Sequence, residues 1–376
     1  MSLITVEVDK NGSEMIKSLL FVNGTLQLVS ALVAFNLLRE EDDAERELYV
    51  CYCDVVGNGG EAYNTIKAMV RDDAKKTFCI GIKQLTKLRY SCKTSAKKIM
   101  KDYLGKLNYD EIYLGTLIHY QHRLLVNTYK NAKKICIGHG MGLVGESNKW
   151  FYSKHFVSII RKVLCDFSDV HHIFDRQILI LPSYLSDASV KSVPLTVPSK
   201  KLVLSIIRKC SENIIIPTIE LTNNTKYCLL LPMNLSQAGW MTSENELSLY
   251  KEILDSIPEE YVIVIKAHPW TPQSFFCNQI FKNRTTVLLD APEYAMIGIE
   301  FYEKIVTEAS FIVTIFSSAF VSLFYLYNPD IKHLFNQCQI DKYFSFKTKG
   351  TASALFKNFE TVFQNLKSWD GKSWLN

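Results

Sequence analysis

Two uninterrupted apolar runs constrain the fold of this chain more than any other feature of its sequence. Residues 261–265, Tyr-Val-Ile-Val-Ile, end at the polar segment Lys-Ala-His-Pro, and residues 310–316 end at a pair of serines. β-Branched and aromatic residues without polar alternation are typical of strands buried on both faces, as in parallel sheets. In open parallel sheets, ligands bind at the carboxyl ends of the strands. We therefore expect the residues that follow these two strands to form a site.

Strand-like and helix-like segments alternate along the rest of the chain, which is typical of doubly wound α/β sheets. In the first half we expect strands at 19–22, 48–53, 76–82, 111–115 and 134–137, and helices at 25–35, 63–72, 93–107 and 119–129. We expect Thr25 to cap the first helix. In the second half a strand at 227–231 precedes a helix at 243–257, for which Ser243 and Glu246 form a capping box.

The length of 376 residues predicts two domains, because single hydrophobic cores stop growing below this size. Residues 181–201 contain three prolines and interrupt the alternation, so we place the domain crossing near there. We predict one Rossmann-like domain over 1–190, a second over 191–355, and a helix over 356–376 that packs back on the domains. Two doubly wound halves whose strand ends face a central cleft describe the GT-B architecture.

The composition excludes several classes of protein. The net charge of +5 is a mild bias without a nucleic-acid-binding motif, so we expect no nucleic acid partner. The ten cysteines include no CxxC pair, and we expect free thiols in a reducing cytosol and no metal or other cofactor. Residues 16–38 are too polar for a membrane span, and acidic residues precede them where a signal peptide is basic. We expect a cytoplasmic protein. The lysines of 93–107 leave peripheral association with the inner face of a membrane open.

The strongest candidate for chemistry is His268, at the end of the run that begins at Tyr261. An imidazole can act as a general acid, or as a hydrogen-bond donor to a phosphate, because it is protonated near neutral pH. Pro269 disfavours helix at His268 and holds it in extended backbone. Ser317 and Ser318 stand where a strand turns into a helix, so their hydroxyls and the free N–H groups of the first turn form a phosphate cradle.

Further candidates lie on both halves. Glu300 has two carboxylate oxygens that match a ribose diol, and Gln237 follows the strand at 227–231 on the donor side. In the first half, His139 lies between two glycines after a strand and can accept a proton from an acceptor hydroxyl, with Glu146 as its competitor. Thr25 and Gln27 follow the first strand and are placed on the acceptor side. Each of these residues also has a plain structural interpretation, as a cap, a turn or a solvated side chain.

The sequence resembles the bacterial GT-B sialyltransferases, the group of the lipooligosaccharide sialyltransferases and capsular polysialyltransferases. The matching pieces occur in the family's order: 23–32, Asn-Gly-Thr-Leu-Gln-Leu-Val-Ser-Ala-Leu; Lys266-Ala-His268-Pro269; Ile297-Gly-Ile-Glu300; and Phe316-Ser317-Ser318-Ala319. The resemblance implies transfer of sialic acid, or a related nonulosonate, from a CMP-sugar to a glycan or glycolipid acceptor of the cell surface. It also implies inversion without a metal, an acceptor-side first domain and a donor-binding second domain. His268 would then assist departure of CMP, Ser317 and Ser318 would hold its phosphate, and Glu300 would hold its ribose.

One departure from the family keeps other interpretations open. The family's base is a carboxylate in an acidic pair before a glycine, where this chain has Gly138-His139-Gly140. That triplet resembles the Trp-His-Gly of CDP-glycerol glycerophosphotransferases of teichoic-acid synthesis, which also carry His-Pro and Ser-Ser motifs. A phosphotransferase that uses a CDP-polyol is therefore the second hypothesis. A nucleotide- or glycan-binding relative without catalysis is the third.

Overall fold

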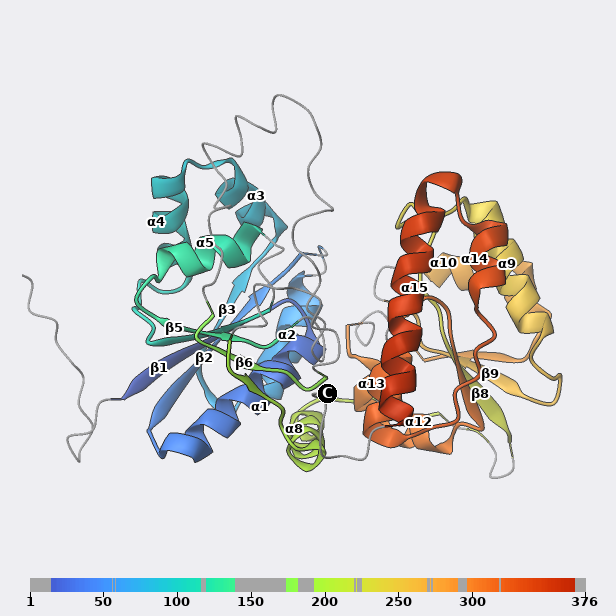
Figure 1. Cartoon of the computed structure of the whole chain (residues 1–376), viewed down its shortest axis with the longest axis horizontal. Helices are drawn as coiled ribbons and strands as arrows, with labels where there is room; N and C mark the ends of the chain where they lie inside the picture. Colours follow the sequence, from blue (N-terminus) through green and yellow to red (C-terminus); the bar gives the residue numbers. More distant parts are fainter. Residues whose placement is uncertain are drawn as a thin grey trace, which may run out of the picture. The chain divides into compact units, whose positions relative to one another are not determined.

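The protein is described here by a computed structural model of the whole chain. It describes residues 15–55, 57, 59–115, 120–138, 174–181, 193–219, 221, 225–268, 271, 273–289, 296–317 and 319–368. The chain forms two compact units, residues 1–214 and 215–376 (Figure 1).

The first unit contains a seven-stranded parallel sheet in the order β3-β2-β1-β4-β5-β6-β7. Its strands are β1 (Ile16–Val22), β2 (Arg46–Cys53), β3 (Ala74–Ile80), β4 (Glu111–Leu114), β5 (Lys133–Cys136), β6 (Arg176–Ile178) and β7 (Leu195–Thr196). β4 is buried throughout, and β1 and β2 are buried from their third residue onward, which includes the apolar runs of their sequences. The strands expected from the sequence are confirmed, except that β3 ends at Ile80 and a helix begins at Ile82.

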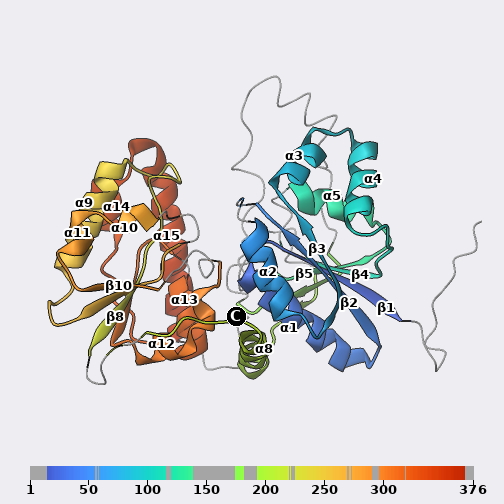
Figure 2. The same cartoon turned by 180° about the vertical axis from the view of Figure 1, so that it is seen from behind.

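Helices cover both faces of this sheet: α1, α2 and α8 lie on one, and α3, α4 and α5 on the other (Figures 1 and 2). Their bounds are α1 (Thr25–Asp42), α2 (Gly59–Met69), α3 (Ile82–Tyr90), α4 (Lys93–Tyr103), α5 (Tyr120–Thr128) and α8 (Lys200–Glu212). Thr25 does not cap α1 as expected. Gly24 holds the cap position without a side-chain bond, and Thr25 is the first helical residue.

The second unit contains a four-stranded parallel sheet in the order β10-β9-β8-β11. The strands are β8 (Tyr227–Leu231), β9 (Val262–Ile265), β10 (Thr286–Leu288) and β11 (Phe311–Thr314). The helices are α9 (Ser243–Asp255), α10 (Gln273–Phe276), α11 (Gln279–Lys282), the 3-10 helix η3 (Ile299–Phe301), α12 (Glu303–Glu308), α13 (Ala319–Tyr327), α14 (Gln337–Tyr343) and α15 (Phe346–Lys367). In Figure 1, α9 and α14 lie on one side of this sheet, and α12 and α13 on the other. Both units are therefore of the doubly wound α/β class that the sequence predicts.

The closing helix α15 belongs to the second unit. Phe356 is buried in the main core of this unit, and the Phe363 ring packs edge-on against Phe320 of α13 at 5.2 Å between centroids. The spacing of these phenylalanines therefore marks the buried face of α15, as the sequence indicates. At the other end of the unit, the boundary between the compact units falls at 214/215, whereas the sequence places it at 190. The boundary lies later because β7 pairs with β6 and α8 packs on α1, so the residues up to 214 belong to the first unit.

None of the described helices combines the length and the apolar composition that a membrane-spanning helix needs.

Candidate nucleotide-binding site

The first part of the candidate site is the end of β9. The N–H of Lys266 still bonds to Leu230 of β8 at 3.1 Å, so the chain leaves the sheet only after this residue. The carbonyl of His268 accepts from the N–H of Thr271 at 2.8 Å, which closes a turn directly after the strand. His268 therefore lies at the carboxyl edge of the sheet, as the sequence predicts. Pro269 lies outside the described residues.

The His268 side chain is mostly buried, and this changes its chemistry. Burial first, and the charge of Lys266 second, lower the pKa of His268 from 6.5 to about 4. This differs from the imidazole protonated near neutral pH that the sequence predicts. With this pKa the ring is neutral at pH 7. A neutral imidazole retains one N–H that can donate to a phosphate oxygen.

The second part is the turn between β11 and α13. The Ser317 hydroxyl accepts from the N–H of Ala319 at 3.2 Å, so it caps the first turn of the helix. Phe316, just before it, has a φ of 54°, which is uncommon for a bulky residue and costs on the order of 1–3 kcal/mol. Aromatic packing holds it there, because Trp240 and Phe344 lie against its ring at 5.2 and 5.4 Å between centroids. Ser318 lies outside the described residues.

Glu300 is tied to the same helix. Its Oε1 accepts from the hydroxyl of Ser322 in α13 at 2.5 Å, and the Tyr327 hydroxyl donates to its backbone carbonyl. Burial raises the pKa of the Glu300 carboxyl, although the Ser322 hydrogen bond and the charge of Lys266 oppose this. Since Lys266 acts on both Glu300 and His268, the three side chains occupy one electrostatic neighbourhood. The structure thus connects Glu300 to the turn that carries Ser317.

The third part is the loop after β8, which carries Gln237. The Asn234 side chain accepts from the N–H of Gln237 at 3.0 Å and donates to its amide oxygen at 2.8 Å. Both carboxylate oxygens of Glu246 accept backbone N–H groups of this loop, from Leu235 at 2.7 Å and Ser236 at 3.0 Å. The predicted capping box is therefore wrong, because the Glu246 carboxylate bonds to the backbone of this loop. The cap of α9 is Thr242, whose hydroxyl accepts from the N–H of Asn245.

The order of the strands fixes how these parts lie. The sequence predicts His268 and the two serines on neighbouring strand ends, but β8 lies between β9 and β11. With strands about 4.8 Å apart, the ends of β9 and β11 are separated by roughly 10 Å. The β8 loop with Gln237 occupies the position between them.

The residues placed on the acceptor side lie at the corresponding edge of the first unit. Thr25 and Gln27 are each 4% exposed, and Gln27 accepts from the N–H of Asn23 at 2.7 Å. The Gln27 amide lies against Gly115 after β4. Sequence reasoning missed Asp54, a buried carboxylate at the end of β2 that accepts from the N–H of Gly57 at 2.8 Å. The proposed bases, His139 and Glu146, lie outside the described residues.

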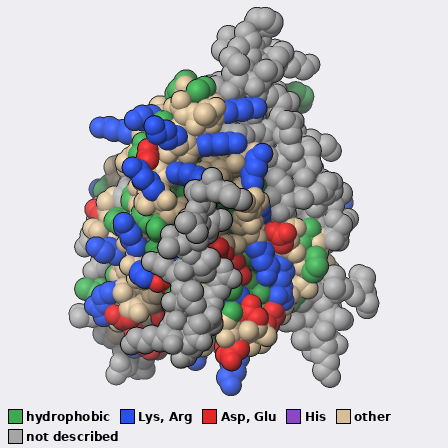
Figure 3. All heavy atoms as spheres, turned by 90° about the vertical axis from the view of Figure 1, so that its left-hand side faces the viewer, with side chains coloured by type: hydrophobic (Ala, Val, Ile, Leu, Met, Phe, Trp, Pro, Cys, Tyr) green, Lys and Arg blue, Asp and Glu red, His purple; other side chains and the backbone are tan. Residues whose placement is uncertain are grey.

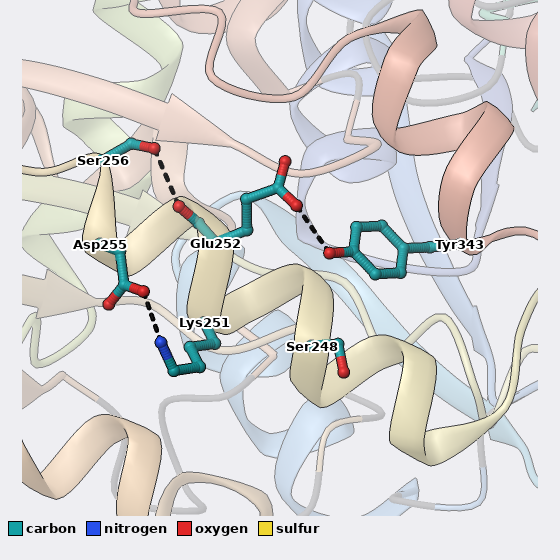
Figure 4. Close-up of a pocket in the computed structure, with 6 residues that line it drawn as sticks. All are labelled: Ser248, Lys251, Glu252, Asp255, Ser256 and Tyr343. Atoms are coloured by element: carbon teal, nitrogen blue, oxygen red, sulfur yellow. Dashed lines mark hydrogen bonds and ion pairs between the residues drawn. The ribbon is translucent and has the colours of Figure 1, made fainter.

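A hollow of about 480 Å³ elsewhere on the second unit does not fit a ligand site. Six residues of α9, its carboxyl-terminal end and α14 line it: Ser248, Lys251, Glu252, Asp255, Ser256 and Tyr343 (Figure 4). Its charged groups already bind protein partners, since Glu252 accepts from the Tyr343 hydroxyl at 2.6 Å and Lys251 pairs with Asp255 at 2.6 Å. The hollow also extends to the end of α9 that leads into β9, away from the carboxyl edge of the sheet. Within the described residues no cluster of three His, Cys, Asp or Glu could hold a metal ion.

Comparison with solved structures identifies the fold. The chain is similar to S. aureus MnaA in its UDP co-structure, with a TM-score of 0.50 and 12% identity over 95% of this chain and 89% of that one. The spinosyn rhamnosyltransferase SpnG complexed with thymidine diphosphate also matches, with a TM-score of 0.47 and 9% identity over 95% and 93% of the two chains. No family model and no curated protein matches the sequence.

At 12% identity the likeness to MnaA shows the fold alone. Together with the two parallel sheets in two compact units, it defines the chain as a GT-B protein built from two Rossmann-like domains. The fold predicted from the sequence is thereby confirmed. What this GT-B protein acts on must be argued from its own residues.

Proposed function

We propose that the protein is a glycosyltransferase that uses a nucleotide-activated sugar. Its donor would be a CMP-sugar of sialic acid or a related nonulosonate, and its acceptor a glycan or glycolipid of the cell surface. The reaction would run in the cytoplasm, with inversion and without a metal ion.

One observation carries the proposal. The three motifs shared with the GT-B sialyltransferases, around His268, Glu300 and Ser317, belong to one sheet edge and to the helix that follows it. Polar groups that are far apart in sequence and meet at the carboxyl edge of a parallel sheet are the usual form of a nucleotide site. The resemblance alone would not require this arrangement.

Each residue has a role that its environment allows. Ser317 and the first N–H groups of α13 would hold the phosphate of CMP, which the positive end of the helix favours. Neutral His268 would donate its N–H to the same phosphate as charge develops there. A ribose hydroxyl would donate to Oε2 of Glu300, because Oε1 already accepts from Ser322. Gln237 and Pro269 would line the donor from the neighbouring strand ends.

The chemical step would be a single displacement at the anomeric carbon. The acceptor hydroxyl attacks this carbon and loses its proton to His139, while the bond from the carbon to the phosphate oxygen of CMP breaks. Thr25 and Gln27 would contribute to the acceptor side by shaping the strand end beneath it, since both side chains are buried.

The test is release of CMP by the purified protein from CMP-sialic acid, other CMP-nonulosonates, CMP-Kdo and CDP-glycerol, each with a panel of glycan acceptors. His268→Ala should lower turnover by about 10²–10³-fold, as for removal of one preorganised hydrogen-bond donor to developing negative charge. The matched control is His333→Ala, a histidine of the same unit that packs on Phe320 and Phe363. Full activity of His268→Ala would refute the assignment.

A second candidate is a glycerophosphotransferase that uses CDP-glycerol. Gly138-His139-Gly140 favours it, because a histidine replaces the acidic pair of the sialyltransferases. Release of CMP from CDP-glycerol alone would decide for it. Binding of CMP without release from any donor would decide for a non-catalytic nucleotide-binding protein.

A further inference from the structure

Residues 82–106 carry an unusual concentration of positive charge. This stretch of α3, α4 and the turn that follows contains eight Lys and Arg and one acidic residue, Asp102. The whole chain has a net charge of +5, so the remainder holds 35 basic against 37 acidic residues and is slightly negative. The positive charge of the protein is therefore a local property of these two helices, which we name the basic face.

Acidic residues are scarce on the basic face. Asp102 pairs with Lys106 at 3.9 Å, but within the described part of the chain no ion pair involves Lys83, Lys87 or Lys98. Other helices of the protein place an acid four residues from a lysine, as in Lys251–Asp255 of α9 and Lys304–Glu308 of α12. On the basic face this stabilising spacing is represented by Asp102–Lys106, and the acidic residue Asp102 stands against eight basic ones.

α4 even repeats a like charge at the spacing that destabilises a helix. Lys93, Lys97 and Lys101 recur every four residues, and each like pair at this spacing costs about 0.2–0.5 kcal/mol. Burial first, then the charges of Lys130 and Lys93, lower the pKa of Lys97, which shows that the positive groups lie close together. Lys93, Lys97 and Lys101 therefore add to the local positive charge of the basic face.

The basic face is an outer layer of its unit. α3, α4 and α5 pack together on one side of the sheet, with the buried Leu88, Ala96 and Met100 turned inward (Figures 1 and 2). Figure 3 views the side on which α4 lies in Figure 1, and Lys and Arg side chains gather over its upper part with few acidic ones among them.

Two large apolar side chains are exposed among these charges. Tyr90, at the end of α3, is 70% exposed, and Ile82, at its start, is 43% exposed. A soluble polyanion has no apolar surface that an exposed isoleucine could contact. At a membrane, an amphipathic tyrosine and an isoleucine enter the boundary between headgroups and acyl chains, while the lysines remain at the phosphates.

We propose that the basic face docks the protein on a membrane surface rich in anionic lipid. Charge supplies the attraction, and Tyr90 and Ile82 supply a shallow apolar contact that distinguishes a lipid surface from a soluble polyanion. This inference does not depend on the proposed donor or reaction.

The experiment is sedimentation of the full-length protein with vesicles of phosphatidylcholine alone, or of phosphatidylcholine and phosphatidylglycerol in equal parts. Wild type should bind the anionic vesicles and not the neutral ones, and salt should weaken the binding. Neutralising three exposed lysines, Lys83→Gln, Lys87→Gln and Lys98→Gln, should lower the partition coefficient about 100-fold, or roughly fivefold for each lysine near an anionic surface. Tyr90→Ser should weaken vesicle binding with the net charge unchanged.

A matched control removes three exposed lysines of the second unit, Lys282→Gln, Lys347→Gln and Lys357→Gln, which changes the net charge by the same amount. It should bind like wild type, and thermal unfolding should show that both triple variants are folded. Equal loss in both triple variants would overturn the proposal, because net charge and not the basic face would then matter. Failure of wild type to bind anionic vesicles, or binding to RNA or polyphosphate without vesicle binding, would also overturn it.

Discussion

The protonation state of His268 is the most informative local property of the candidate site. Burial and Lys266 lower its pKa from 6.5 to about 4. At about 1.4 kcal/mol for each pKa unit, this shift amounts to roughly 3 kcal/mol against the charged imidazole in the folded protein. We expect the side-chain NMR signals of His268, assigned with His268→Asn, to titrate with a midpoint near pH 4.

Replacing Lys266 shows how much of the lowered pKa of His268 is due to burial alone. Lys266→Met removes a buried charge beside His268, so the pKa of His268 should rise, yet stay below 6.5 because burial remains. Below about pH 6.5, the His268 side chain binds fewer protons in the folded protein than in the unfolded chain. The contribution of His268 to stability is therefore complete above about pH 6.5 and is lost as the pH falls through about 4. A midpoint at or above 6.5 in wild type would refute this account of the site.

Three further predictions concern the scaffold and the reaction. Glu111→Gln should lower the stability of the first unit by about 3 kcal/mol, because the buried Arg46 guanidinium loses the carboxylate that bonds to it at 3.1 Å. As a control, Lys75→Gln removes an exposed ion pair with Glu47 and should cost under about 1 kcal/mol. Equal losses of stability in thermal unfolding would contradict this prediction. Gly115→Ala should destabilise the protein by about 1–3 kcal/mol, because the added Cβ would lie 3.0 Å from a backbone oxygen and closer still to the Gln27 amide. At Gly60 an added Cβ meets nothing within 4 Å, so Gly60→Ala should be neutral or stabilising. Chelation with EDTA should leave CMP release unchanged, and activity restored only by a divalent ion would show that the reaction needs a metal.

Much of the fold could be predicted from the sequence because the buried strands are continuous apolar runs. β1, β2, β8, β9 and β11 each contain such a run, and the polar residues that follow β9 and β11 lie at the carboxyl edge of the second sheet. The short strands β6 and β7 carry no such signal. The boundary that the sequence predicts at 190 therefore falls between β6 and β7, although their pairing joins β7 to the first sheet.

The candidate site was harder to predict, because its parts depend on contacts between distant residues. Nothing local in the sequence shows that Glu246 braces the loop after β8, or that Ser322 holds Glu300. The position of β8 between the two site strands is likewise a matter of sheet order, which spacing along the chain does not fix. Burial of His268 also depends on the packed structure, so its low pKa could not be inferred from the motif.

The most direct test of the central claim is calorimetric titration of CMP into wild type, Ser317→Ala and Ser256→Ala. Ser317 lies at the carboxyl edge of the second sheet, and Ser256 lines the hollow beside α9. We predict that wild type binds CMP, that Ser317→Ala weakens binding about tenfold through loss of a hydrogen bond to a charged group, and that Ser256→Ala binds normally. Loss of binding in Ser256→Ala with normal binding in Ser317→Ala, or no binding of CMP by wild type, would contradict the account.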